Sequence, residues 1–583
     1  MNLVQRIEAL RNKMREQGID YYYVPSIDQH KNEYVPDCWQ RRTWISGFSG
    51  SAGDALIGLN EAYLWTDARY FLQAENELPK HFTLMKQVQG VAPVDGWLRK
   101  NAVGKTLAVD PKVVSLTQGQ RLGQAMMDAQ GKFVDLEANL VDAVWRDQPK
   151  LSGAPVVIYP EHYAGLSANA KIQQVRDALQ NVKADAHVIS MLDAIAWVYN
   201  IRGCDVAFNP LVISYALISA KEAYLFVDPA KIQDKAYFAA EGITLLPYEA
   251  FAAELQKLSG KVWVDAGSAS LWLSQQLKHA QLHLEASPIS LLKAVKNPTE
   301  LAGMQLAHEK DAAAMIEFIQ WLERNWPSQT EISASDKLAA VRKQDTDFRD
   351  LSFDTISAYA SNGAIIHYRA SDASAKKLDD KALYLLDSGA QYWQGTTDIT
   401  RVFHFGEPLS MEKRHYTLVL KGHLALRHAI FPAGTFGENL DILARKPLWD
   451  AGLNYGHGTG HGVGCYLCVH EGPQVISPRG SGVPLLPGMI VSNEPGVYFP
   501  GQYGIRIENL VYVKVHSKTA MGEFYTFEDL TLVPHNRKLI DTDLLSAQEI
   551  EWINQYHTRV YRTLAKRVSA EAAAWLKAAC ADL

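Results

Sequence analysis

The sequence predicts a mixed α/β (α+β) protein of three domains, in which two related α/β units precede a strand-rich domain that ends in helices. The chain has 583 residues, which is about twice the length at which a single hydrophobic core stops growing. Strand-like and helix-like segments alternate along its first half, as they do in α/β units. A short sequence of the first unit also recurs in the second.

The first α/β unit is expected over residues 1–150. Apolar residues at helical spacing predict an amphipathic helix that begins at Leu3, and Gly18 can end it. Strands are predicted at residues 19–24, 55–59 and 62–66.

The second unit is expected over residues 151–293, and it begins within a linker-like Gln-Pro-Lys-Leu-Ser-Gly-Ala-Pro segment that ends at Pro155. Its sequence Glu222-Ala-Tyr-Leu-Phe-Val-Asp228 matches Glu61-Ala-Tyr-Leu-Trp-Thr-Asp67 of the first unit. Each copy follows an apolar strand and a turn. We therefore expect the second unit to repeat the fold of the first.

The third domain is expected over residues 294–583. At its start Asn297 can cap a helix, Pro298 fits the first turn, and Glu300 can satisfy free N–H groups of that turn. The apolar face of this helix continues to about Trp326. Further helices are predicted from Ser333 or Ser335 to Val341, at 546–564 and at 570–579.

Composition and charge exclude several classes of protein. Hydrophobic residues make up 47% of the chain and charged residues 21%, which are ordinary values for a globular protein. The net charge is only −6 and no basic run is present, so no nucleic acid partner is expected. No apolar stretch approaches the ~20 residues that span a bilayer, and the N-terminus lacks a signal-peptide pattern. Five scattered cysteines fit a reducing compartment, so we expect a cytoplasmic protein that does not bind membranes.

Two aspartates of the third domain are expected to meet across a hairpin. Leu383-Tyr-Leu-Leu-Asp387 is a buried-strand pattern that ends in a carboxylate, and Asp398 follows eleven residues later. A turn near residues 391–395 would bring both side chains to one edge of the sheet. Two buried carboxylates that close repel each other unless a cation lies between them. The structural alternative is that one aspartate caps a turn and the other binds Arg401.

A glycine-rich run carries two candidate histidines. Glycine occupies every second position from Gly456 to Gly464, and His457 and His461 lie between them. Each glycine would cost a helix roughly 1 kcal/mol. A loop or strand is therefore expected, in which the backbone can come close to a ligand. Two histidines in this setting favour a ligand role over a structural one.

Two glutamates each follow a strand-like run. In Ile505-Arg506-Ile507-Glu508 the period of two places Arg506 and Glu508 on one face and the isoleucines on the core side. Glu494 ends an apolar strand that starts at Met489. The structural alternatives are an Arg506–Glu508 ion pair and a turn-stabilising role for Glu494. Taken with the aspartates and histidines, these glutamates predict an oxygen-rich site for two divalent metal ions.

These motifs together resemble the pita-bread metallopeptidases, and the likeness to the three-domain, cytosolic type of Xaa-Pro aminopeptidase extends over nearly the whole chain. The resemblance implies two creatinase-like N-terminal domains before a pita-bread catalytic domain. The motifs that carry it are Trp65-Thr-Asp-Ala-Arg69, Phe353-Asp-Thr-Ile-Ser, Asn362-Gly-Ala-Ile-Ile-His367, Asp387-Ser-Gly-Ala-Gln, Gly395-Thr-Thr-Asp398, His457-Gly-Thr-Gly-His461, Val469-His470-Glu-Gly-Pro and Gly504-Ile-Arg506-Ile-Glu508.

The resemblance also implies a role for each candidate residue. The metal ligands would be Asp387, Asp398, His461, Glu494 and Glu508. They would hold two divalent ions. Mn²⁺ is the first candidate because four of the five ligands are carboxylates, and Co²⁺, Fe²⁺ and Zn²⁺ are the alternatives. The catalytic residues would be Glu494, His470, His367 and His457. The substrate would be bound by Arg69, His367, His457, His470 and Arg506.

The implied reaction releases the N-terminal residue from peptides with proline in the second position, through a hydroxide that two metal ions activate. Glu494 would carry the proton, and His470 or His367 would stabilise the oxyanion. A prolidase-type dipeptidase is the alternative, and a non-catalytic pita-bread binding module is a distant one. The family also implies a homodimer. Asn493 and Val497 depart from the family pattern, which puts the shape of the pocket in question.

Overall fold

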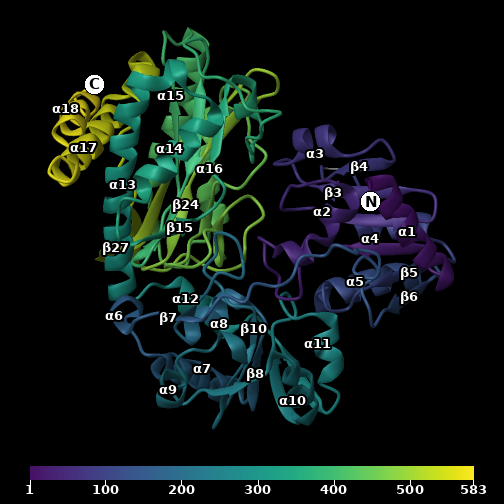
Figure 1. Ribbon diagram of the computed structural model, residues 1–583. Coiled ribbons are helices and arrows are strands. Elements are labelled where there is room, and N and C mark those ends of the chain that lie inside the picture. The colour runs from purple at the N-terminus through teal and green to yellow at the C-terminus, as the bar shows by residue number, and fades with distance from the viewer. Residues whose placement is uncertain (89) are drawn as a thin grey trace. The chain divides into compact units, whose positions relative to one another are not determined.

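The chain folds into two compact units. The computed structural model describes residues 1–88 and 90–583. One unit consists of Met1–Glu161 with Leu166–Ser290, and the other of His162–Gly165 with Leu291–Leu583. In Figure 1 the purple and blue elements belong to the first unit, and the green and yellow elements belong to the second. Within the described residues, no helix combines the length and the apolar character that crossing a membrane requires.

A six-stranded sheet with the order β4-β3-β2-β1-β5-β6 organises the first part of the first unit. Strand β1 pairs antiparallel with β2 and parallel with β5. The elements are α1 (Leu3–Glu16), β1 (Tyr21–Val24), α2 (Arg41–Ser46), β2 (Asp54–Gly58), β3 (Ala62–Thr66), α3 (Phe71–Glu77), β4 (Phe82–Lys86), α4 (Val94–Asn101), β5 (Thr106–Val109), α5 (Leu116–Asp128) and β6 (Lys132–Asp135). The predicted first helix and the three predicted strands are confirmed.

A second six-stranded sheet has the order β12-β11-β10-β8-β13-β14. Strand β8 pairs antiparallel with β10 and parallel with β13, as β1 does with β2 and β5. The elements are β7 (Val157–Ile158), α6 (Glu161–Ala164), α7 (Ala168–Val182), β8 (Ala186–Ile189), α8 (Leu192–Val198), β9 (Ile201–Arg202), β10 (Ser214–Ser219), β11 (Ala223–Val227), α9 (Lys235–Ala240), β12 (Thr244–Leu246), α10 (Phe251–Lys257), β13 (Gly260–Val264), α11 (Leu271–Gln276) and β14 (Ala280–Leu284).

The predicted repeat is confirmed by this shared strand order. The two matching sequences lie on β3 and β11, and each of these strands is second in its sheet, between the edge strand and the next antiparallel neighbour. Both sheets lie in one compact unit. The predicted domain boundaries near residues 150 and 293 therefore stay predictions.

The helix predicted at the start of the third domain is confirmed as α13 (Pro298–Asn325), which follows α12 (Pro288–Ala294). The Asn297 side chain accepts hydrogen bonds from the backbone of Thr299 and Glu300, and the Glu300 carboxylate accepts one from Asn297 N–H. This reciprocal cap satisfies donors that the first turn cannot pair.

The next helix begins earlier than predicted. Helix α14 spans Glu331–Arg342, because Thr330 caps it and the hydroxyl of Thr330 accepts a hydrogen bond from Ser333 N–H. Ser333 is the third helical residue, and its own hydroxyl accepts from Thr330 N–H. The predicted starts, Ser333 and Ser335, both lie inside the helix.

The second unit contains two sheets that matter for the site, with the orders β16-β17-β20 and β21-β28-β27-β24-β22-β23. Two shorter groups, β15-β18-β19 and β25-β26, accompany them. The strands are β15 (Phe348–Leu351), β16 (Ile356–Tyr359), β17 (Tyr384–Ser388), β18 (Ala390–Tyr392), β19 (Gly395–Thr396), β20 (Ile399–Phe403), β21 (Ile430–Pro432), β22 (Gly460–Gly462), β23 (Glu471–Ile476), β24 (Ile490–Asn493), β25 (Gly496–Phe499), β26 (Tyr503–Arg506), β27 (Asn509–Thr519) and β28 (Gly522–Asp529).

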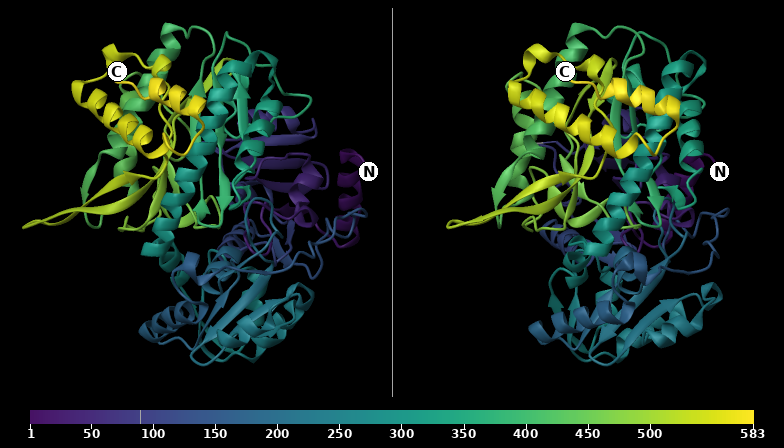
Figure 2. Two further views of the ribbon diagram at one scale, coloured as in Figure 1. Left: turned by 60° about the vertical axis from the view of Figure 1, so that its left-hand side comes forward. Right: turned by 90° about the vertical axis from the view of Figure 1, so that its left-hand side faces the viewer.

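Helices cover these sheets. The remaining helices are α15 (Ser410–Arg427), α16 (Gly437–Trp449), α17 (Ala547–Leu564) and α18 (Ala570–Ala579), so the two predicted terminal helices are confirmed. Figure 2 shows α17 and α18 in yellow beside the teal α13. Buried side chains of all three helices share one core with the β16-β17-β20 sheet, among them Ile319, Leu564 and Leu576.

Candidate metal centre

The hairpin predicted between Asp387 and Asp398 is confirmed. Asp387 lies on β17 and pairs across the strands with Thr400 of β20, and Asp398 directly precedes β20. An isolated bridge joins Thr400 to Glu508, two residues beyond the end of β26. The strand register therefore brings three carboxylates together from two distant parts of the chain.

His461 and Glu494 reach the same place from the larger sheet. His461 lies on β22, which pairs with β24, and Glu494 directly follows β24. Hydrogen bonds fix both backbones: Glu494 N–H donates to Thr459 O over 2.8 Å, and His461 N–H donates to Ser492 Oγ over 2.9 Å. A Cβ at Gly460 would lie 1.9 Å from Ser492 O, so only glycine permits this close approach. The run is a loop that leads into a strand, as predicted.

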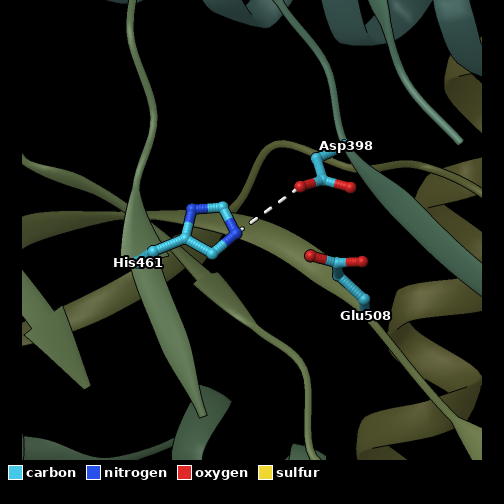
Figure 3. A group of neighbouring side chains, drawn as sticks. All are labelled: Asp398, His461 and Glu508. Atoms are coloured by element: carbon cyan, nitrogen blue, oxygen red, sulfur yellow. Dashed lines mark ion pairs between the residues drawn. The ribbon is translucent and has the colours of Figure 1, made fainter. Parts of the chain in front are cut away.

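Asp398, His461 and Glu508 form one compact group (Figure 3). Each residue offers one ligand atom, and the three atoms lie within 4.8 Å of one another. His461 Nε2 is 3.6 Å from Asp398 Oδ2 and 3.6 Å from Glu494 Oε1. His461 Nδ1 lies 2.9 Å from Gly462 O, and in the neutral ring it donates to that carbonyl. The lone pair of Nε2 then faces the carboxylates, as a metal ligand requires.

Asp387 is joined to the cluster by an ion pair with Arg506. Arg506 Nη2 lies 2.6 Å from Asp387 Oδ2, so the ion pair of Arg506 is with this aspartate rather than with Glu508. Glu508 Oε2 instead accepts a hydrogen bond from Thr400 Oγ1 over 2.7 Å. Arg401, the other suggested partner, donates to the carbonyl oxygens of Thr400 and Glu508. Neither of the two ion pairs suggested as structural alternatives, with Arg401 and between Arg506 and Glu508, is found among the described residues.

Burial and the crowding of like charges raise the pKa values of three carboxyl groups in the cluster. Burial, followed by the charges of Glu508 and other neighbours, raises the pKa of Asp398 well above its usual range. Burial and the charge of Asp387 likewise raise the pKa of Glu508. Burial raises the pKa of Glu494 from 4.5 to about 7, although Arg506 opposes this shift. Without added cations, the cluster therefore retains protons near neutral pH.

The residues present fit two hard divalent cations. Asp387 Oδ1 and Asp398 Oδ1 are buried and have no hydrogen-bond partner, although buried carboxylate oxygens are normally satisfied. The ion pairs and charge interactions place Arg506 against a cluster of four carboxylates. Carboxylate oxygens with one imidazole are ligands suited to Mn²⁺ and similar ions. The cluster thus lacks the positive charge that such ions would supply.

Two further predicted histidines lie beside the cluster. The His470 ring is edge-on to the ring of His461, with centroids 4.3 Å apart. His367 follows Ile366, whose carbonyl oxygen lies 3.5 Å from Arg506 Nη2. Both histidines are half-buried, and their contact with a substrate stays a prediction.

Sequence reasoning missed a tyrosine that connects two candidate residues. Tyr498 accepts a hydrogen bond from Arg506 Nη1 over 2.7 Å and donates one to His457 Nε2 over 2.8 Å. Burial raises the pKa of Tyr498 to about 12, so its hydroxyl keeps the proton that it donates. The link depends on the pairing of β25 with β26, which sets Gly496 opposite Arg506. The sequence does not reveal that register.

Two smaller hydroxyl residues were also missed. Thr400 Oγ1 accepts from Arg506 Nε over 3.1 Å in addition to its bond to Glu508. Ser492 Oγ lies 3.2 Å from Glu494 Oε1 and donates to it. The period of two offers a signal for both, because each lies two residues from a candidate ligand.

Arg69 belongs to the other compact unit. Its guanidinium pairs with Asp67 over 2.7 Å and lies over the Tyr70 ring, 5.2 Å from the centroid. Its contact with a substrate stays a prediction.

The two departures from the family pattern lie in buried surroundings. Asn493 is fully buried, and its Nδ2 donates to His423 O over 2.9 Å. Val497 is 2% exposed and packs in the hydrophobic core with Leu385 and Ile505. Both side chains are therefore part of the packing beneath the site.

Comparison with known proteins accounts for nearly the whole chain. Residues 302–515 match metallopeptidase family M24, and residues 523–583 match its C-terminal region. Residues 6–144 and 147–300 each match a creatinase/prolidase N-terminal domain. The chain is 43% identical to a probable Xaa-Pro aminopeptidase P of Botryotinia fuckeliana, over 96% of this chain and 90% of that one. The chain belongs to metallopeptidase family M24.

Other relatives of this M24 chain agree. A probable Xaa-Pro aminopeptidase P of Sordaria macrospora is 42% identical, over 97% of this chain and 96% of that one. The X-prolyl aminopeptidase of Caenorhabditis elegans, described as a cytosolic enzyme with a di-nuclear active site, has 35% identity and a TM-score of 0.96 over 100% of both chains. An Xaa-Pro dipeptidase of Bacillus anthracis has 26% identity and a TM-score of 0.52, over 64% of this chain and 99% of that one. The predicted family, fold class and enzyme class are confirmed.

Proposed function

We propose that this M24 chain is an Xaa-Pro aminopeptidase, which releases the N-terminal residue from peptides with proline in the second position. The observation that carries the proposal is the group of Asp398, His461 and Glu508, whose ligand atoms lie within 4.8 Å of one another. It occurs in a chain that aligns with proteins named Xaa-Pro aminopeptidase over nearly its full length. A metal-binding cluster alone is compatible with many classes of hydrolase. The alignment with proteins named Xaa-Pro aminopeptidase narrows the proposed reaction to that class.

The cluster supports binding of two divalent ions, with Mn²⁺ as the first candidate. The residues that would hold them are Asp387, Asp398, His461, Glu494 and Glu508. When bound, such ions polarise a carbonyl group and lower the pKa of an attacking water molecule. The unpaired buried oxygens of Asp387 and Asp398 support this assignment.

Glu494 suits the role of proton carrier. Its side chain is 18% exposed, whereas that of Asp398 is 5% exposed, so a water molecule reaches Glu494 more easily. Ser492 Oγ donates to its Oε1 and orients the carboxylate. An acid whose pKa lies near neutral pH gives up and accepts a proton readily. Burial moves the pKa of Glu494 toward this range in the protein alone.

The surrounding side chains suit the binding of a peptide. Tyr498 and Arg506 orient His457, and His470 lies against His461. An N–H group of His470 or His367 can stabilise the negative charge that develops on the scissile carbonyl oxygen. The bond before proline is a tertiary amide without an N–H group, so the pocket must accept the ring without that donor.

The prolidase-type alternative uses the same kind of site. The Bacillus anthracis dipeptidase aligns with 64% of this chain, whereas the Caenorhabditis elegans aminopeptidase aligns with all of it. The alignment with the dipeptidase leaves part of this chain unmatched, although it covers 99% of that protein. This difference supports the aminopeptidase over the dipeptidase.

Three finer points belong to the same proposal. The protein would act as a homodimer in the cytoplasm, and Arg69 would contact the substrate. The Caenorhabditis elegans protein is described as cytosolic, which supports the location. Sedimentation of the purified protein would decide the oligomeric state, and an Arg69→Ala variant would test that side chain through the KM for the peptide.

A peptide series tests the proposed reaction. The metal-loaded protein should release alanine from Ala-Pro-Gly with a kcat/KM at least roughly tenfold higher than from the dipeptide Ala-Pro or from Ala-Ala-Gly. Equal rates on Ala-Pro-Gly and Ala-Ala-Gly would contradict the preference for proline. Faster cleavage of Ala-Pro than of Ala-Pro-Gly would favour the dipeptidase.

A further inference from the structure

A buried ion pair on α16 lies outside the predicted site. Arg445 Nε donates to Asp441 Oδ2 over 2.6 Å, and the two residues are one helical turn apart. Each is only 3% exposed. Moving both charges out of water costs more free energy than an ion pair between neighbouring turns returns. Helix stability alone therefore does not explain why this pair is buried.

The other N–H groups of Arg445 donate hydrogen bonds to the backbone of the glycine-rich loop. Nη1 donates to Tyr455 O over 2.8 Å, and Nη2 donates to His457 O over 2.7 Å. The guanidinium also lies 3.9 Å from the centre of the Tyr455 ring. The two carbonyl groups flank Gly456, which has no side chain to fix its conformation. Arg445 supplies that restraint from the helix.

The second oxygen of Asp441 holds the other end of the loop. Thr459 Oγ1 donates to Asp441 Oδ1 over 2.6 Å, and the Tyr455 hydroxyl lies 2.5 Å from Thr459 Oγ1. Because Thr459 has one hydroxyl hydrogen and gives it to Asp441, Tyr455 is the donor in the second bond. Thr459 and Tyr455 are 0% and 4% exposed, so water does not compete for these bonds.

Two routes lead from this network to the site. On one route the His457 ring reaches Tyr498, and through it Arg506 and Asp387. On the other route, Thr459 O accepts the N–H of Glu494 over 2.8 Å. The ion pair thus binds the backbone of His457 directly and reaches the backbone of Glu494 through Thr459.

We propose that Arg445 and Asp441 are positioning residues for the hydrolysis, which fix the backbone from Tyr455 to Thr459 and thereby orient His457 and Glu494. The inference rests on the proposed function, because it concerns the rate of that reaction. Neither residue touches substrate or metal ligand side chains in this network. Their effect passes through the loop.

An Arg445→Lys variant tests the inference, since lysine keeps the charge but cannot bind Asp441 and two carbonyl groups in one fork. We expect kcat/KM for Ala-Pro-Gly to fall 10- to 100-fold, mostly through kcat, with metal content unchanged. Arg41→Lys is the matched control, because Arg41 is buried and bound at two points to Asp142 in the other unit. It should lower the melting temperature without changing kcat/KM.

A double-variant cycle separates positioning from general stability. Arg445→Lys should have less than a threefold effect in a His457→Ala background, because its main target is then absent. A loss of kcat/KM in the double variant equal to the full product of the two single-variant losses would overturn the inference. So would a loss that only follows metal content, or a kcat/KM equal to that of the wild type.

A second variant carries the test if Arg445→Lys fails to fold. Thr459→Val keeps the shape of the side chain and removes only its hydroxyl, and it should lower kcat/KM about tenfold. An unchanged kcat/KM in a folded Thr459→Val protein would overturn the inference. A wild-type protein that cleaves no Xaa-Pro peptide would instead overturn the proposed function, so the two failures are distinguishable.

Discussion

Glu331 and Asp398 are both buried carboxylates of the second unit, but their surroundings are opposite. The oxygens of Glu331 accept hydrogen bonds from Tyr359 N–H, Lys376 N–H, the Asn362 amide and the Tyr368 hydroxyl. Asp398 has one oxygen without a partner and three carboxylates among its neighbours. The same chemical group is thus fully satisfied at one place and crowded by like charge at the other.

The difference separates a structural acid from a metal-binding one. Burial raises the pKa of Glu331, and its hydrogen bonds oppose that rise. At Asp398 the neighbouring carboxylates add to the effect of burial, and Arg506 opposes it. A buried acid with a full set of donors stabilises the fold, whereas a buried acid among other acids needs a cation.

Removing one carboxylate of the cluster should have the largest effect on turnover. Asp398→Asn should lower kcat/KM by on the order of 10³-fold or more, as the loss of a central catalytic group does. Bound metal, measured by elemental analysis, should fall as well. The melting temperature of the metal-free protein should hold or rise, because the amide is neutral without binding a proton among the other carboxylates. Unchanged turnover and metal content would remove the basis for the comparison.

Breaking the link behind the cluster should have a smaller effect. Tyr498→Phe removes the hydroxyl between Arg506 and His457 and keeps the ring. The loss of two hydrogen bonds of ordinary strength should lower kcat/KM about tenfold. Steady-state kinetics on Ala-Pro-Gly at fixed metal content would measure it. A rate equal to that of the wild type would show that the link is not needed for turnover.

The pH dependence of stability sharpens the comparison without a mutation. Burial raises the pKa of Glu494 from 4.5 to about 7, so the metal-free folded state binds a proton that the unfolded state releases. Stability from this group is present below the ordinary pKa and is lost as pH rises through about 7. The melting temperature of the metal-free protein should therefore fall between pH 5 and 8. Glu494→Gln should reduce that slope, and an identical slope would contradict it.

The satisfied acid should matter least for turnover. Glu331→Gln replaces an acceptor of several hydrogen bonds by an amide, which should destabilise the fold by about 1–3 kcal/mol. The folded fraction should keep the kcat/KM of the wild type and its full metal content. Urea unfolding and kinetics on one preparation would measure both quantities. A large loss of kcat/KM in folded protein would show that the two acids are not of different kinds.

Local patterns predicted much of the fold and of the cluster. The hairpin of Asp387 and Asp398 follows from a strand, a turn and a second strand within 20 residues, so sequence spacing is enough to define it. The cap of α13 also follows from adjacent residues. The start of α14 was placed too late, at Ser333 or Ser335, because the reciprocal hydrogen bonds of Thr330 and Ser333 begin the helix at Glu331.

Features that depend on long-range register could not be predicted. Tyr498 reaches His457 only because β25 and β26 pair as they do, and the restraint from Arg445 depends on how α16 lies against the loop. Neither arrangement has a local sequence signal. The ion pair suggested for Arg506 was with Glu508 on the same strand face, whereas its partner is Asp387 on the distant strand β17. The chemical role of a side chain was thus easier to predict than the residues that it contacts.

The repeated sheet has a consequence for the history of the chain. When the two matched sequences are aligned, Asp67 corresponds to Asp228 and Arg69 corresponds to Ala230. Only the earlier copy therefore carries a guanidinium after its third strand. If the two sheets arose by duplication, the first copy kept this group and the second copy lost it. The second copy would then be free to change in sequence, although its strand order would still be that of the common ancestor.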